Sequence, residues 1–483
     1  MGVSLNPATI LSGQGIDVSS VVSQIINEQS GQLSVWQGEQ TAFATQDGLL
    51  EGEENNLSSL ESAVAALASP TGALTAQTAN SAQPAIVTAT AQSNAVFGTH
   101  EIEVNSLATT GSLYTNPVAA GATTSILSSG QTTGELQLQV GGSGGTTDNI
   151  AITQGSNDTL TTLAAYINTQ STENNWGVTA SVVSDGSGSR LSLESQNSGS
   201  AGALAITGNT NTSLTFATPT GGTNASLTID GVPFSSSTNT VTGAIQGVTL
   251  SLVSQSPGTQ VQLSIAPDQG QITTAVNNFI SAYNSVISTI NSQYVVDPTG
   301  ATPAPPLESD ISLRSLQSSL LTDGSYSIGG NGGLVNLSSL GIVTNNDGTL
   351  SLGLTPGGQT FADVLANNPS GVQSFFQNAS GTGFANNFNA DLTNLTNPTS
   401  GPLNVDLTQN EAEDADLTTT IANFQAQLST ETTALTTQFE SVNASLQAYP
   451  LLLQEVTETL GTLAGSTSSS GSSTSSPTLT SGL

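Results

Sequence analysis

Apolar residues recur every seven positions near the beginning of the chain, within a stretch that is otherwise polar. The series comprises Trp36, Phe43, Leu50, Leu57 and Val64, with Leu60 and Leu67 three positions after the last two members. This spacing predicts a helix over residues 16–68, with Ser19 or Ser20 as N-cap and Ser69-Pro70 as its end. Glycines at 31, 38, 48 and 52 each weaken it by about 1 kcal/mol relative to Ala, so breaks are expected.

The other end of the chain carries a matching series. Its members are Ile421, Leu428, Leu435, Val442, Tyr449 and Val456, and the stripe is widened by Phe424, Phe439 and Leu446. We expect this helix to begin near the acidic stretch 410–417, where carboxylates favour the positive end of the helix dipole, and to kink or end at Pro450. Each series forms half of a seam, so antiparallel pairing of the two ends is predicted. Two ordinary core helices are the alternative.

Between the two ends, residues 70–270 alternate in a Thr-, Ser- and Gly-rich pattern that predicts β-strands. Strands are expected at 134–140 and 148–154, followed by a helix over 157–170 capped by Asn157 or Asp158. Hairpins are predicted with turns at Asp185-Gly186 and Asp230-Gly231, and another over residues 345–352.

Two further amphipathic helices are predicted beyond the strands, over residues 271–293 and 308–321. In the second helix Asp310 and Arg314 lie one turn apart and are expected to pair. The segment from residue 465 onward is a low-complexity Ser/Thr tail, for which disorder is expected.

These patterns predict an α+β multidomain chain whose terminal helices pair as a coiled coil, with β-rich domains inserted between them. The expected divisions are an N-terminal helix (1–70), a discontinuous β-rich domain (71–125 and 225–268), an inserted β-rich domain (126–224), an α/β domain (269–404), a C-terminal helix (405–464) and the tail (465–483).

The charge balance limits the partners of the chain. Two Arg, no Lys and 34 Asp and Glu give a net charge of −32, which makes nucleic acid and anionic membrane surfaces poor partners. The chain has no run of about 18 apolar residues, so its sequence predicts no transmembrane helix. Because few charges would remain in acid, one hypothesis is adaptation to an acidic exterior. A composition bias of the lineage is an equal alternative.

The residue inventory argues against catalysis. With no Cys, no Lys and a single His, thiolate, Schiff-base and most triad chemistries are absent. His100 lies in an alternating strand pattern and is interpreted as a surface or edge histidine. Calcium binding by Glu411, Glu413, Asp414 and Asp416 is possible, but their spacing matches no EF-hand loop. We therefore predict a non-enzyme without cofactor or metal.

The opening of the chain raises a question of export. Its composition is typical of an extracellular protein, yet no Lys or Arg precedes Arg190 and no apolar run suited to a signal peptide precedes Gly31. The residues by themselves leave the route of export open.

Several stretches, in this order, resemble the hook-associated protein 2 family of flagellar filament caps. They are "GIDVSSVV" with the long helix that follows, "AVFGTHEIEVNSLATTGSL", "LTIDGVPFSSSTNTVTGAIQGVTLSLVS", "FISAYNSVISTINSQ", "LESDISLRSLQSSL", "LSSLGIVTNNDGTLSL" and "QFESVNASLQ". Residues 134–206, with "AAYIN" and "GVTASVV", resemble the flagellin-type IN repeat. The chain departs from the family in its terminal helices, which carry Gly, Gln and Ser where Lys and Arg are usual.

The resemblance implies a capping protein at the flagellum tip that forms a homo-oligomeric ring. In it the paired terminal helices would be a coiled-coil leg and the discontinuous β-rich domain (71–125 and 225–268) a plate, and the chain would be exported without a cleaved signal peptide. Implied partners are flagellin, the hook-associated junction proteins and an export chaperone at the C-terminal helix. Leg packing and flagellin contact would then fall to the two heptad series, taken as Trp36, Phe43, Leu50, Leu57, Val64, Ile421, Leu428, Leu435 and Val442. The alternatives are a secreted adhesin or surface-layer protein, and a glycan-active enzyme built on two carboxylates.

Overall fold

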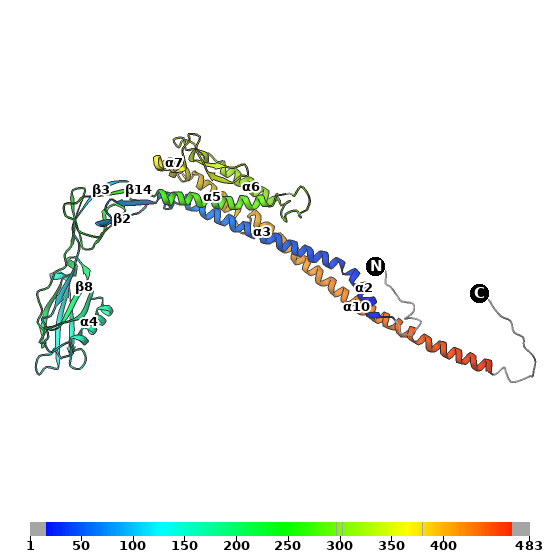
Figure 1. Cartoon of the computed structure of the whole chain (residues 1–483), viewed down its shortest axis with the longest axis horizontal. Coiled ribbons are helices and arrows are strands. Elements are labelled where there is room, and N and C mark those ends of the chain that lie inside the picture. The colour runs from blue at the N-terminus through cyan, green and yellow to red at the C-terminus, as the bar shows by residue number, and fades with distance from the viewer. Residues whose placement is uncertain (1–15, 296, 302, 379, 466–483) are drawn as a thin grey trace, which may run out of the picture. The chain divides into compact units, whose positions relative to one another are not determined.

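The computed structural model describes residues 16–465 apart from 296, 302 and 379 (Figure 1). It combines helices with antiparallel sheets and divides into two compact units. The first unit contains the chain up to Ser59, residues 285–322 and the chain from Asp391 onward. The second contains residues 60–284 and 323–390. The predicted Ser/Thr tail lies outside the described residues except for Gly465.

The N-terminal part of the first unit is helical but is not one helix. It consists of α2 (Val18–Gln29) and α3 (Gly31–Ala68), separated at Ser30. The cap of α2 is Asp17 rather than the predicted Ser19 or Ser20, since its carboxylate accepts a hydrogen bond from the Ser20 amide at 3.2 Å. The break coincides with the first of the four glycines, whose lack of a side chain disfavours helix. The other three lie inside α3, which ends before Ser69-Pro70 as predicted.

The C-terminal helix α10 (Pro402–Gly465) is 64 residues long. It begins at Pro402, a residue suited to the first helical position, so the acidic stretch 410–417 lies inside the helix and not at its start as predicted. Pro450 does not end the helix either. Pro450 is exposed, so water can bind the carbonyl group that loses its partner there.

A first core in the second unit lies between two antiparallel sheets. One sheet has the order β1 (Gln77–Ser81), β14 (Val261–Pro267), β3 (Gly98–Ser106), β10 (Ala225–Ile229), β11 (Val232–Ser236). The other has the order β12 (Thr240–Ile245), β13 (Val248–Leu252), β2 (Val87–Ala91). Ile102 and Leu263 of the first sheet and Leu250 of the second are fully buried in this core. The predicted turn at Asp230-Gly231 is confirmed by the pairing of Ile229 with Val232.

A second core belongs to the segment inserted between β3 and β10. Its sheets have the orders β4 (Thr110–Tyr114), β8 (Gly188–Ser198), β7 (Val178–Asp185) and β6 (Thr146–Thr153), β5 (Thr133–Val140), β9 (Leu204–Thr210). Helix α4 (Leu160–Asn174) adds Leu163 and Ile167 to the same core. The hairpin predicted at Asp185-Gly186 is confirmed.

The cap of α4 differs from the prediction. Thr159 caps the helix together with Thr162, whereas Asn157 and Asp158 use their side chains in the preceding loop. Asn157 Oδ1 accepts from the Thr153 amide at 2.8 Å and Asp158 Oδ1 from the Gly155 amide at 3.1 Å. Because the side chains of Asn157 and Asp158 already accept hydrogen bonds from amides of the loop, the hydroxyl of the next residue, Thr159, caps the helix.

The rest of the chain is mostly helical. It comprises α5 (Gln269–Ser292), α6 (Ile311–Gly324), the hairpin β15 (Ile342–Thr344) and β16 (Leu350–Leu352), α7 (Phe361–Asn367), α8 (Pro369–Phe376) and α9 (Phe384–Leu395). Single-turn 3-10 helices lie at Ala73–Thr75, Gly142–Gly144, Ser200–Gly202 and Leu337–Leu340. In the second unit, six aromatic side chains pack with ring centroids 5.1–6.4 Å apart: Phe279, Tyr283, Phe375, Phe376, Phe384 and Phe388. No described helix is long and apolar enough to cross a membrane.

Candidate functional site: the paired terminal helices

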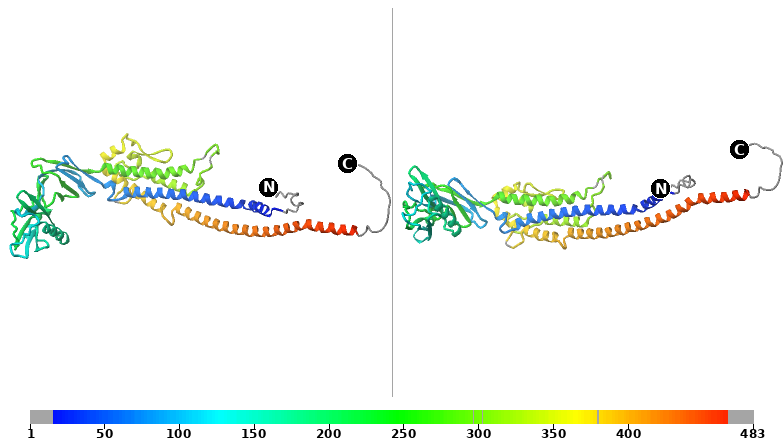
Figure 2. Two further views of the ribbon diagram at one scale, coloured as in Figure 1. Left: turned by 60° about the horizontal axis from the view of Figure 1, so that its bottom comes forward. Right: turned by 90° about the horizontal axis from the view of Figure 1, so that it is seen from below.

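Contacts at regular intervals join the two ends of the chain within the first unit. They pair Ile16 with Asn443, Gln29 with Glu431, Trp36 with Phe424, Gln40 with Thr418, Asp47 with Asn410 and Glu54 with Asn404. The two residue numbers of every pair add to between 457 and 460. The terminal segments are therefore antiparallel and keep one register over almost 40 residues, as the two views of Figure 2 also show for α3 beside α10.

The apolar residues of the two heptad series are buried to different extents. Leu50, Leu57, Ile421 and Leu428 are at most 8% exposed. Trp36, Phe43 and Leu435 are partly buried, and the Trp36 ring meets Phe424 edge to face with centroids 5.3 Å apart. Val64 is fully buried, but in the second unit. Within the first unit, the predicted seam therefore extends along α3 from Trp36 to Leu57, and Leu50 and Leu57 are its most buried residues on this helix.

Val442 lies differently from the rest of its series, since it is 48% exposed. A straight helix drifts about 20° per heptad relative to a seven-residue repeat, so a column of residues seven apart turns off the contact line. Leu435, Phe439, Asn443 and Leu446 are among the residues near this end of α10 that are partly buried instead.

The polar contacts of the pair use amides where other proteins use cations. The Gln29 amide donates to Glu431 at 2.8 Å, the Asn410 amide to Asp47 at 2.8 Å and the Asn404 amide to Glu54 at 2.9 Å. The chain contains no Lys, and neither of its two Arg is in α2, α3 or α10. Neutral donors satisfy the carboxylates without an ion pair, so salt screening has little to act on.

One buried carboxylate was missed from the sequence. Glu53 is 1% exposed, at the position three after Leu50 where the later heptads of α3 carry Leu60 and Leu67. Its Oε2 accepts from the Asn56 amide at 3.0 Å, and burial raises the pKa of Glu53 to about 7. A carboxylate at that heptad position is the signal that could have identified it.

A small pocket of about 170 Å³ lies beside this part of α3 in the first unit. Leu50, Leu307, Asp310, Asp406 and Asn410 are among its lining residues. Burial and the neighbouring Asp310 raise the pKa of Asp406, while a hydrogen bond with Ser312 opposes this. Across the described part of the chain, no group of three or more acidic or His side chains could hold a metal ion. Glu411, Glu413, Asp414 and Asp416 lie along α10.

The predicted ion pair between Asp310 and Arg314 does not form among the described residues. Asp310 accepts from the Leu313 amide at 2.9 Å as a helix cap, and the Arg314 guanidinium donates to the Glu308 carbonyl at 3.0 Å. Arg314 also lies 5.3 Å from the centre of the Tyr294 ring. Asp310 therefore caps the helix, whereas Arg314 contacts a backbone carbonyl and an aromatic ring, and each group has other partners than the one predicted.

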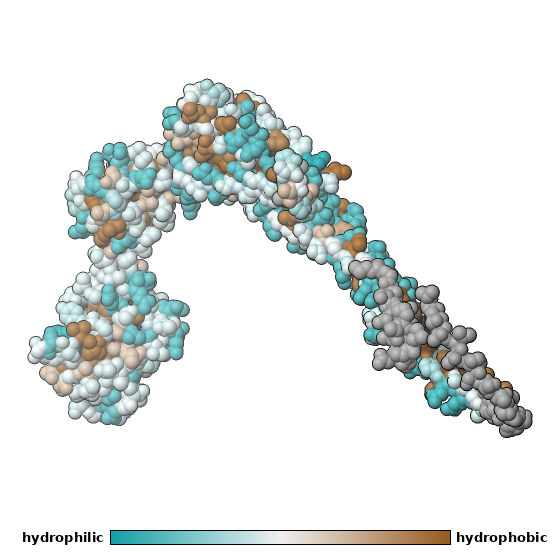
Figure 3. All heavy atoms as spheres, turned by 45° about the vertical axis from the view of Figure 1, so that its right-hand side comes forward, coloured by the Kyte–Doolittle hydropathy of each residue, from teal (hydrophilic) through white to brown (hydrophobic). Residues whose placement is uncertain are grey.

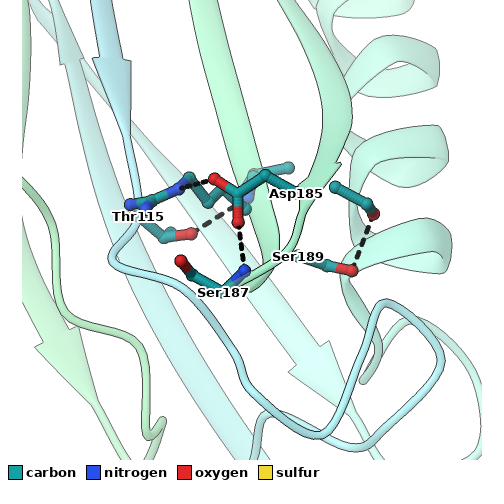
Figure 4. A network of polar contacts seen from close by, with 7 residues as sticks. Thr115, Asp185, Ser187 and Ser189 are labelled. Atoms are coloured by element: carbon teal, nitrogen blue, oxygen red, sulfur yellow. Dashed lines mark hydrogen bonds and ion pairs between the residues drawn. The ribbon is translucent and has the colours of Figure 1, made fainter.

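The other two groups that can carry positive charge serve turns of the second unit. The Nε of Arg190 lies 3.6 Å from Oδ2 of Asp185. Both residues belong to a polar cluster at the β7–β8 turn that also contains Thr115, Ser187 and Ser189 (Figure 4). The Ser187 amide and Arg190 lower the pKa of Asp185. His100 was interpreted as a surface or edge histidine; its side chain is 23% exposed at the surface, but its strand β3 is not an edge strand because it lies between β14 and β10.

The His100 side chain meets the turn residue Asp230. Its Nδ1 is 2.7 Å from Asp230 Oδ2, and Asp230 Oδ1 accepts from the Glu101 amide at 2.9 Å. Asp230 has a φ of 51°, so the pair holds a backbone conformation that few residues other than glycine favour. This is the geometry of a structural contact.

Beyond Asn443 the apolar side chains of α10 are largely uncovered. Their exposed fractions are 64% for Tyr449, 55% for Leu453, 52% for Val456, 61% for Leu460 and 67% for Leu463. They follow alternating steps of four and three residues, the spacing of a helix–helix seam. Elsewhere on the surface seen in Figure 3, apolar groups form small separate patches among polar ones.

Two family models of one protein match most of the chain. The model described as flagellar hook-associated protein 2 N-terminus matches residues 14–111, and that described as the C-terminus of the same protein matches residues 222–449. The flagellin hook IN motif matches residues 135–197, inside the segment predicted to resemble such a repeat.

Known proteins agree with these models. The B-type flagellar hook-associated protein 2 of Pseudomonas aeruginosa is 28% identical and covers 92% of this chain and 96% of its own length. The lateral flagellar hook-associated protein 2 of Vibrio parahaemolyticus is 27% identical over 61% of this chain and 66% of its own. A crystal structure of domains D1–D3 of the Escherichia coli flagellar cap protein FliD, 24% identical, matches with a TM-score of 0.60 over 75% of this chain and 99% of that chain.

The fold of paired terminal helices with antiparallel sheets inserted between them in the sequence is thus similar to that of a flagellar cap protein. The chain belongs to the flagellar hook-associated protein 2 family.

Proposed function

We propose that this chain is a non-enzymatic cap at the distal end of a bacterial flagellar filament, outside the cell. In this role it acts as a homo-oligomeric ring that helps exported flagellin to fold and join the filament, and prevents its loss. The observation that carries the proposal is the single antiparallel register between the two ends of the chain. The names of its relatives agree with it.

The parts of the chain take separate roles in this proposal. Residues 16–70 and 405–464 form a coiled-coil leg, the β-rich segments 71–125 and 225–268 form the plate, and 126–224 is a β-rich domain inserted into the plate. Leg packing and flagellin contact fall to the two heptad series. Val442 and the apolar residues beyond it are exposed in the single chain, which suits a surface that other subunits cover.

Other partners follow from the same role. Hook-associated junction proteins would precede the cap during assembly, and an export chaperone would cover the C-terminal helix beforehand. The proposed role involves neither nucleic acid binding nor membrane insertion. A net charge of −32 agrees with this, because such a chain cannot neutralise phosphate groups. A secreted adhesin or surface-layer protein is the second candidate, because such proteins would share the Thr- and Gly-rich strands of this chain.

A charge placed in the helix seam tests the proposal. Leu428 is 8% exposed, so Leu428→Asp buries an unpaired carboxylate between the two terminal segments and should separate them. In a flagellated strain that lacks its own copy of this gene, the variant should give no filaments by electron microscopy and release flagellin into the medium.

Thr433→Asp is the matched control, because it adds the same charge to an exposed position of the same helix. It should support normal filaments. Normal filaments with Leu428→Asp, in a protein whose helices are shown to be separated, would contradict the proposal. A native mass of a single chain under assembly conditions would also contradict it, and loss of surface attachment alone would favour the adhesin.

A further inference from the structure

Helix α3 carries one acidic side chain in an otherwise aliphatic row. The row advances by alternating steps of three and four residues and consists of Leu50, Glu53, Leu57, Leu60, Val64 and Leu67. Every aliphatic member is at most 1% exposed, and so is Glu53. A carboxylate in such a row is shielded from water as completely as its leucine neighbours, and an ionised one would lose its hydration.

The surroundings of Glu53 offer hydrogen bonds but no positive charge. Asn56 donates to Oε2 at 3.0 Å, and Thr289 of α5 also bonds to the carboxylate. Glu53 Oε1 is buried and has no hydrogen-bond partner among the described residues. A neutral carboxylic acid fits this site better than a carboxylate, since it has only one oxygen that strongly requires a donor.

The charged groups on neighbouring elements of the first unit do not compensate Glu53. On α3 itself, Asp47 and Glu54 are bound by amides of α10. Asp406 of α10 and Asp310, which precedes α6, line one pocket together with Leu50 of the same row. The cation of this region, Arg314, donates to a backbone carbonyl and lies over the Tyr294 ring. Ionisation of Glu53 would therefore add an unpaired charge to an acidic neighbourhood.

We propose that Glu53 is a proton-operated latch in the helices of the first unit. With a proton bound, its neutral side chain packs in the apolar row and holds α3 against the C-terminal half of α5. Without the proton, the buried charge has no counter-ion, and the helices open locally around residues 46–60. The device depends on the chain's own residues and does not rest on the proposed function.

The direction of the effect follows from linkage. Burial raises the pKa of Glu53 in the folded helices from its ordinary 4.5 to about 7. The stabilisation by the bound proton is fully present below pH 4.5 and is lost as the pH rises to 7. From well below pH 4.5 to well above pH 7 the equilibrium constant for opening should increase roughly 300-fold in total, a factor of ten per unit of pKa.

Hydrogen exchange on the full chain between pH 4.5 and 8.5 tests the latch. Protection factors, corrected for intrinsic exchange, should fall for residues 46–60 as the pH rises through this range. Glu53→Gln cannot ionise and should keep a nearly constant protection factor. Glu51→Gln, at an exposed position of the same helix, should behave like the unchanged chain.

Two results would overturn the latch: a flat protection profile in the unchanged chain, or the same decline in Glu53→Gln. If Glu53→Gln does not fold, Glu53→Leu serves instead, and it should protect residues 46–60 at pH 8 at least as well as the unchanged chain does at pH 5. The single histidine of the chain, His100, lies in the second unit. Exchange over residues 98–106 of the second unit separates its effect from that of Glu53.

Discussion

The inserted β segment and the paired terminal helices bury their apolar residues to very different degrees. In the β segment Leu136, Leu193 and Ile150 are fully buried between two sheets and a helix. Along the terminal helices Trp36, Phe43 and Leu435 stay partly exposed, and Tyr449 is 64% exposed. The sheets thus complete a core within one chain, whereas the helices leave apolar surface that the described residues do not cover.

The two regions also differ in how they satisfy carboxylates. Two charged contacts of the described residues, His100 with Asp230 and Arg190 with Asp185, belong to turns of the second unit. The terminal helices use Asn and Gln amides instead. In a chain so poor in cations, a long helix pair can still be specified by neutral donors, and its register then depends on shape and hydrogen bonds more than on charge.

The largest expected effect is the loss of a methyl-rich side chain from the β core. Leu193→Ala should lower the free energy of unfolding of the inserted segment by about 2–5 kcal/mol, because the side chain is fully buried between neighbours that cannot collapse around the cavity. Urea unfolding followed by hydrogen exchange of β7 and β8 measures it.

Leu435→Ala is the matched substitution in the terminal helices. This leucine is partly exposed, so the loss in the first unit should stay below about 1.5 kcal/mol. Equal losses at Leu193 and Leu435 in the isolated chain would abolish the contrast between a complete and an incomplete core.

The seven-residue series predicted the two helices and their antiparallel pairing before any coordinates. It did not predict the break at Ser30 or the start of α10 at Pro402, since periodicity marks a face and not an end. The caps at Asp17 and Thr159 were missed for a similar reason. Which of several adjacent polar residues caps a helix depends on the hydrogen bonds that the preceding loop already makes.

The candidate site was predicted in its apolar part more completely than in its polar part. Leu50, Leu57 and Leu428 are buried where the heptads placed them. Glu53 was not identified, because composition and spacing treat an acidic residue as solvent-facing until its neighbours are known. The amide–carboxylate contacts escaped for the same reason, since they join residues about 350–400 positions apart.

A smaller effect is expected for the aromatic contact of the helix pair. A double-mutant cycle of Trp36→Ala and Phe424→Ala should give a coupling energy of about 0.5–1.5 kcal/mol, the usual range for an edge-to-face pair. Hydrogen exchange of the flanking amides in the full chain provides the free energies. Phe43→Ala combined with Phe424→Ala is the control cycle, and a coupling there as large as in the first would show that the contact is not specific.

The smallest effect concerns the amide donors. Asn410→Ala removes the donor to Asp47 and should cost about 1 kcal/mol in local opening of residues 36–54, independent of salt. Asn410→Lys supplies a cation at the same place and should recover part of that loss at about 50 mM salt, by a few tenths of a kcal/mol. At about 1 M salt the recovery should disappear, because the Debye length falls to about 3 Å.

High salt also relieves the self-repulsion of a chain with a net charge of −32, so only differences between variants at equal salt are informative. A salt dependence in Asn410→Ala as steep as in Asn410→Lys would mean that ionic attraction already contributes to the helix pair, and the contrast between amide-bound helices and ion-paired turns would fail.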